Sequence, residues 1–79
     1  MSTQPMTEQI KQAITAQMPD AVVAVDGGGG HFNIQVTSTL FAGKSMLEQQ
    51  RLVYKAIAPL MAGTNAPLHA VDSMKCRVP

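Results

Sequence analysis

The segment from Ala21 to Ser38, AVVAVDGGGGHFNIQVTS, contains two apolar runs separated by four consecutive glycines. In the second run, apolar Phe32, Ile34 and Val36 alternate with polar residues, a period of two that is typical of a half-buried β-strand. Glycine readily adopts the positive φ angles that tight hairpin turns require. The segment therefore predicts a β-hairpin whose second strand opens at His31.

A helix is expected before this hairpin and another after it. Apolar residues recur near helical spacing from Pro5 to Met18, with Thr3 or Thr7 available as a cap. After the hairpin, the segment SMLE at 45–48 has the spacing of a capping box, and Gly63 is placed to end the second helix. Pro59 lies inside the apolar stripe of this helix, and we expect it to kink the helix or end it early.

The C-terminal segment LHAVDSMKCRV, residues 68–78, is interpreted as a third strand. Its apolar side chains occupy alternate positions and its polar side chains mostly occupy the positions between them, so one face of the strand should be exposed to solvent. The core parity holds Leu68, Ala70, Met74, Cys76 and Val78, and the opposite parity holds His69, Ser73, Lys75 and Arg77.

The order helix, strand, strand, helix, strand predicts a small α/β (α+β) domain that occupies all of residues 1–79. A chain of 79 residues has room for one small core. A strand that returns to its sheet through a helix usually runs parallel to the strand it left, so the third strand should lie parallel to the second. We therefore expect a three-stranded mixed sheet with helices on one face.

This topology brings the two histidines of the chain together. His31 opens the second strand and His69 lies near the opening of the third, so both should lie at one end of the sheet. Each is on the polar parity of its strand, and its imidazole should face solvent or a partner. Two imidazoles can ligate a metal, but a closed structural zinc site usually takes four protein ligands, and Cys76 is expected at the far end of the strand. Alternatively, His31 is simply a polar residue that starts a strand after a turn.

Composition limits the other functional classes. The formal charge of +1 is too small for a dedicated nucleic-acid-binding protein, although Lys44, Arg51, Lys55, Lys75 and Arg77 could form a weak basic face. The single cysteine excludes an intramolecular disulfide and favours a cytoplasmic location, and no apolar run approaches the roughly 20 residues of a membrane span. The acidic residues and histidines show no triad order or paired-carboxylate spacing, so we do not expect an enzyme.

Several short motifs in a fixed order resemble the BolA-like family. That family has a histidine or cysteine loop before the second strand, an S-x-x-F-x-G link, a helix with R-x-V-Y, and an I-H-A triplet that opens the last strand. The matching positions are His31, Phe32, Ser38, Phe41, Gly43, Arg51, Val53, Tyr54, Leu68, His69 and Ala70. The resemblance covers about Met6 to Val78 and implies a fold similar to the class II K-homology (KH) domain.

The resemblance also implies a function. BolA-like proteins pair with a monothiol glutaredoxin and share a bridging [2Fe–2S] cluster, to which the glutaredoxin supplies a cysteine together with the thiolate of glutathione. Here His69 and His31 would be the metal ligands of this chain, in iron–sulfur cluster handling or stress regulation. The isolated chain, a monomer or weak homodimer, would hold no cofactor. The family's link to transcription makes a DNA-binding regulator the alternative.

The chain departs from the family pattern at three places. Gln50 stands where many relatives have a histidine before the helix arginine. The four glycines predict a loop that is longer and looser than usual before His31. The stretch after His69 runs one residue long before Pro79, where the sequence stops. His69 is therefore the better supported of the two ligands.

Overall fold

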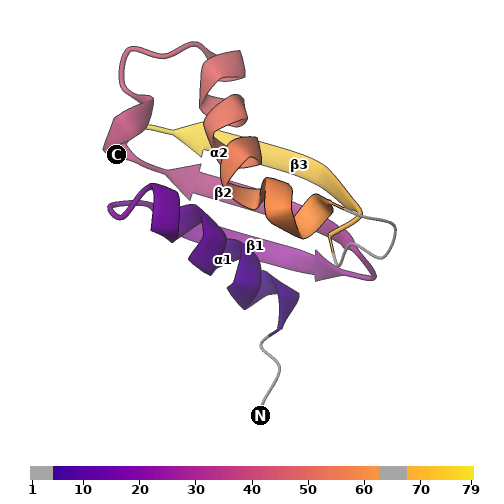
Figure 1. Cartoon of the computed structure of the whole chain (residues 1–79). Helices are drawn as coiled ribbons and strands as arrows, with labels where there is room; N and C mark the ends of the chain where they lie inside the picture. The colour runs from indigo at the N-terminus through magenta and orange to yellow at the C-terminus, as the bar shows by residue number, and fades with distance from the viewer. Residues whose placement is uncertain (1–4, 63–67) are drawn as a thin grey trace.

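A computed structural model describes residues 5–62 and 68–79 of the chain (Figure 1). The elements follow in the order α1 (Met6–Gln17), β1 (Val22–Gly28), β2 (His31–Thr37), a 3-10 turn η1 (Thr39–Phe41), α2 (Met46–Met61) and β3 (Ala70–Arg77). Strand β2 lies at the centre of the sheet, antiparallel to β1 and parallel to β3. Both helices pack on the same face of the sheet (Figure 1). The predicted α+β architecture with a mixed three-stranded sheet is confirmed.

The core lies between this sheet face and the two helices. Strand β2 alternates buried and exposed residues along its length, as its sequence predicts, and Phe32, Ile34 and Val36 are almost completely buried. Because β2 has a neighbour on each side, its apolar face lies at the centre of the core. The other buried apolar residues are Ile10, Ile14, Met18, Val23, Phe41, Val53, Ala56, Ile57 and Leu68. No helix in the described ranges is both long and apolar enough to cross a membrane.

Strand β3 is irregular near its start. Phe32 of β2 pairs with Val71, but the next residue, Asn33, pairs with Ser73, which leaves Asp72 as one extra residue. This β-bulge changes which residues share a face of the strand. Ala70 pairs with His31 and is not part of the core, whereas Val71, Met74 and Cys76 pack against it. The prediction that Ala70 lies on the core parity is therefore wrong, because one parity cannot describe a strand that contains a bulge.

The N-terminus of α2 has the predicted capping box. The Ser45 hydroxyl accepts a hydrogen bond from the Glu48 N–H at 3.2 Å, and the Glu48 carboxylate accepts one from the Ser45 N–H at 3.4 Å. Of the two outcomes expected at Pro59, the early end is wrong, since α2 continues past Pro59 to Met61. The kink stays a prediction. Gly63, the expected end of the helix, lies outside the described residues.

The first helix does not use Thr7 as its cap. Pro5 is the N-cap residue, no side chain of residues 5–62 or 68–79 caps the helix, and the carbonyl of Pro5 accepts hydrogen bonds from the N–H groups of Glu8 and Gln9 at 3.0 Å. A cap by Thr7 is thus wrong, and Thr3 lies outside the described residues. The fixed φ of proline is compatible with the start of a helix.

The link between β2 and α2 is held by a carboxylate from the loop after α1. Asp20 accepts hydrogen bonds from the N–H of Thr39 at 2.8 Å, from the Thr39 hydroxyl at 2.7 Å and from the Ser38 hydroxyl at 2.9 Å. These donors, the Thr39 N–H foremost, lower the pKa of Asp20. The same link places Phe41 in the core. Two matches to the family motif, Ser38 and Phe41, therefore have structural roles.

Candidate metal-ligating site

The glycine tract forms a shorter turn than its sequence suggests. Gly27 and Gly28 belong to β1 and pair with Phe32 and His31, so only Gly29 and Gly30 connect the two strands. Their φ angles are 63° and 84°, the positive values that a two-residue turn of type I′ requires. The expectation of a long, loose loop is therefore wrong. The short turn fixes where β2 starts, and with it the backbone of His31.

His69 is held against the same turn. The carbonyl of Gly30 accepts hydrogen bonds from the backbone N–H groups of His69 and Ala70, both at 2.9 Å. The His69 imidazole also lies over the α-carbon of Gly30, so closely that a methyl group on that carbon would overlap the ring. Gly30 thus contacts both the backbone and the side chain of His69.

These contacts bring the two histidines to one end of the sheet, as the topology predicted. His31 follows Gly30 directly and pairs with Ala70, which follows His69. Both histidines are exposed, with 59% of the His31 side chain accessible. Both side chains are thus exposed at this end of the sheet, that of His69 over Gly30 and that of His31 on the next residue along the chain. Whether they ligate a metal stays a prediction.

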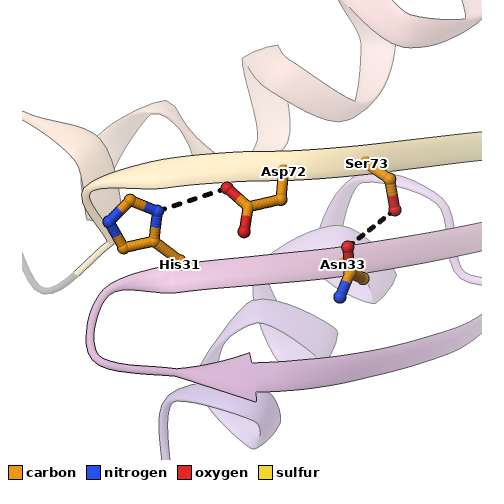
Figure 2. Close-up of polar contacts among 4 residues, drawn as sticks. All are labelled: His31, Asn33, Asp72 and Ser73. Atoms are coloured by element: carbon orange, nitrogen blue, oxygen red, sulfur yellow. Dashed lines mark hydrogen bonds and ion pairs between the residues drawn. The ribbon is translucent and has the colours of Figure 1, made fainter.

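The bulge gives His31 a partner that the sequence analysis did not identify. The Nδ1 atom of His31 lies 3.2 Å from Oδ1 of Asp72 (Figure 2). Next to it, the Ser73 hydroxyl donates a hydrogen bond of 2.8 Å to Oδ1 of Asn33. The stretch after His69 is one residue longer than the family pattern, and the pairing of β3 with β2 leaves one residue over in the same stretch.

Cys76 does not join the histidines. It pairs with Val36 near the opposite end of the sheet from the pair of His31 and Ala70, and it packs against the core. Partial burial raises the pKa of its thiol, which disfavours the thiolate that binds metals. In the described part of the chain, no three histidine, cysteine or acidic side chains are grouped as a metal site requires. The two imidazoles could therefore form part of a site, completed by ligands from another molecule.

The basic residues that could bind nucleic acid are not gathered on one element of the fold. The five candidate cations are exposed but belong to three parts of the fold: the loop before α2, the helix itself and β3. The pattern Gly-x-x-Gly at 27–30 lies in a β-hairpin, whereas a K-homology domain uses such a loop to clamp a nucleic-acid backbone. Nothing in this geometry specifies a nucleic-acid groove.

Comparisons with known proteins agree with the motif order and the fold. A family model for BolA-like protein matches residues 6–79. Protein BOLA2 of Arabidopsis thaliana is 30% identical over 76 residues, which cover 91% of this chain and 77% of that protein. An uncharacterised protein from the rpoN–murA intergenic region of Acinetobacter guillouiae is 34% identical over 65 residues, or 82% of this chain and 76% of the relative.

Solved structures give the same result at the level of the backbone. A BolA protein homologue from Coxiella burnetii has 32% sequence identity and a TM-score of 0.76, with 100% of this chain and 94% of that chain covered. BolA1 from Arabidopsis thaliana superposes with a TM-score of 0.79 over 98% of this chain and 95% of that chain. Its identity of 18% supports the fold alone.

Proposed function

Because this chain belongs to the BolA-like protein family, we propose that it is a non-enzymatic adaptor that binds a monothiol glutaredoxin and co-ligates a bridging [2Fe–2S] cluster. His69 and His31 would be its ligands. The observation that carries the proposal is that two exposed histidines lie at the end of the sheet where β2 and β3 begin, His69 with its ring over Gly30 and His31 as the residue that follows Gly30.

The chemistry of this donor set fits such a cluster. Imidazole nitrogen binds iron, and Rieske centres use two histidines on one iron of a [2Fe–2S] cluster. Among the described residues, no three histidine, cysteine or acidic side chains are grouped as a complete metal site requires. A shared site needs this arrangement, because the remaining ligands would be the cysteine of a glutaredoxin and the thiolate of glutathione. When bound, a cluster with histidine ligands would have a higher reduction potential than one with thiolates alone.

The turn makes one ligand better fixed than the other. His69 is constrained through its backbone hydrogen bond to Gly30 and through the contact of its ring with that residue. His31 is constrained through strand pairing and through a single exposed polar contact of its side chain. We therefore expect loss of His69 to have the larger effect on a shared cluster.

The proposal is tested by mixing the protein with a cluster-loaded monothiol glutaredoxin and recording the visible absorption and circular dichroism spectra. The wild-type chain should form a complex with an altered spectrum, and His69→Ala and His31→Ala should each change it. Gln35→Ala is the matched control, an exposed residue of β2 away from the turn. Spectra that are unaffected by either histidine substitution would refute the ligand assignment, and absence of any complex would refute the partner assignment as well.

A DNA-binding regulator is the alternative function. Its support is the set of exposed cations on α2 and β3, which a solvated surface explains equally well. A mobility shift of duplex DNA that weakens as salt is raised would favour it. A flat titration at low salt would remove it.

A further inference from the structure

The bulge in β3 places a carboxylate beside one of the two proposed ligands. Regular pairing would put Asp72 opposite Asn33, but Ser73 occupies that position and Asp72 is left unpaired between Val71 and Ser73. In Figure 2 the side chains of His31, Asp72, Asn33 and Ser73 all lie on the sheet face away from the helices. Bulges commonly re-aim a side chain in this way. Here the re-aimed side chain reaches His31.

The contact has a chemical consequence for the imidazole. Asp72 contacts His31 through Nδ1, at 3.2 Å from its Oδ1. An ionised carboxylate can only accept a hydrogen bond, so Nδ1 of a neutral imidazole must carry the proton. The lone pair of that imidazole is then on Nε2, which is left to bind a metal. Histidines that ligate metals usually donate their other ring N–H to a carboxylate, a carbonyl or water in the same manner.

We propose that Asp72 is a positioning residue, which holds His31 in the Nδ1–H tautomer and orients Nε2 as the ligand atom. The inference rests on the proposed ligand role of His31. It does not depend on a stabilising ion pair, since both side chains are more than half exposed, at 59% and 55%, and such pairs contribute little to folding. The role of Asp72 is to select a tautomer and a ring orientation.

The neighbouring hydrogen bond provides a matched control. Ser73 lies next to Asp72 in the same bulge, and its hydroxyl donates a hydrogen bond of 2.8 Å to Asn33 rather than to His31. Ser73→Ala removes a polar contact from the bulge and leaves the carboxylate in place. Asp72→Asn keeps the shape of the side chain but offers both a donor and an acceptor, so it no longer dictates where the imidazole proton lies.

The first test needs neither a cluster nor a glutaredoxin. Long-range ¹H–¹⁵N NMR spectra of the isolated chain, at a pH where the imidazoles are neutral, report which nitrogen of His31 is protonated. We expect Nδ1–H in the wild type and in Ser73→Ala, and a shift toward Nε2–H in Asp72→Asn. A tautomer of His31 that is the same in Asp72→Asn as in the wild type would overturn the inference.

The second test distinguishes an effect of Asp72 that acts through His31 from a general effect of Asp72 on the structure. In the complex with cluster-loaded glutaredoxin, Asp72→Asn should accelerate cluster release about tenfold or more, the usual effect of losing such an orienting partner. The same substitution in the His31→Ala background should have no further effect, because its action passes through that ring. An equal effect in both backgrounds would contradict the positioning role. If His31→Ala itself leaves the cluster unchanged while the NMR result holds, the ligand role fails and the tautomer control stands.

Discussion

The imidazole of His69 rests on the α-carbon of Gly30, and the carbonyl of Gly30 accepts a hydrogen bond from the His69 backbone. The turn residue that precedes His31 is therefore also the surface against which His69 is packed. A side chain at position 30 would have to displace the ring. The two histidines, 38 positions apart in the sequence, are coupled through one residue without a Cβ atom.

Alanine substitutions along the glycine tract should distinguish two contributions to stability: the strain of a positive φ angle and the contact of position 30 with the His69 ring. Gly28→Ala meets neither a positive φ nor a nearby atom and should change the free energy of unfolding by less than about 0.5 kcal/mol. Gly29→Ala meets a positive φ in open space and should cost about 1–2 kcal/mol. Gly30→Ala meets both a positive φ and the His69 ring, and should cost more. Urea unfolding measures the three values.

The same series predicts an effect on the proposed site. Only Gly30→Ala should shift the NMR resonances of the His69 imidazole substantially and weaken the complex with a cluster-loaded glutaredoxin. Gly29→Ala controls for strain in the turn. If Gly29→Ala and Gly30→Ala affect the complex equally, the packing of His69 on Gly30 is not what presents the ligand.

Strand β2 has one buried face and one exposed face, which substitutions can compare. Ile34 is completely buried between the sheet and the helices, so Ile34→Ala should lower the free energy of unfolding by about 2–5 kcal/mol through lost burial and the cavity that remains. Its neighbour Gln35 is exposed, and Gln35→Ala should stay within about 0.5 kcal/mol of the wild type. Comparable losses for the two variants in denaturant unfolding would mean that β2 does not present the faces described.

Acid should weaken the link between β2 and α2. The donors of Thr39 and Ser38 lower the pKa of Asp20 in the folded state, so its contribution to stability is complete above its unfolded-state pKa and is lost as the pH falls through the folded-state value. Asp20→Asn cannot show this dependence. The stability difference between the two proteins should be constant near neutrality and shrink as the pH falls through that range. Thermal unfolding followed by circular dichroism across acidic pH measures it, and a difference that is independent of pH would contradict the assignment.

Much of the fold could be predicted because its signals are local. The alternation of Phe32, Ile34 and Val36 and the capping box at Ser45 each require only a few residues, and the crossover rule then places β3 parallel to β2. From that step, the meeting of His31 and His69 at one end of the sheet follows directly. The placement of the two histidines, though not their role, therefore follows from the sequence.

Two of the wrong predictions, the loose glycine loop and the core position of Ala70, arose where pairing between strands decides the outcome. Gly27 and Gly28 look like turn residues but extend β1, because β2 supplies partners for them. One extra residue in β3 moves Ala70 off the core face and Asp72 toward His31, and an alternating pattern cannot reveal where such a residue is inserted. The contact between His31 and Asp72 could not be predicted for the same reason. Both errors concern register, which no short window of sequence contains.

The proposed ligation of iron by His69 and His31, in a complex with a monothiol glutaredoxin, can be observed at the ligand nitrogens themselves. The most direct measurement is pulsed electron paramagnetic resonance of the reduced complex, with this chain labelled with ¹⁵N-histidine and the glutaredoxin unlabelled. The account predicts hyperfine couplings from two ¹⁵N nuclei, one lost in His69→Ala and the other in His31→Ala. A reduced cluster in the complex without any ¹⁵N coupling would contradict it.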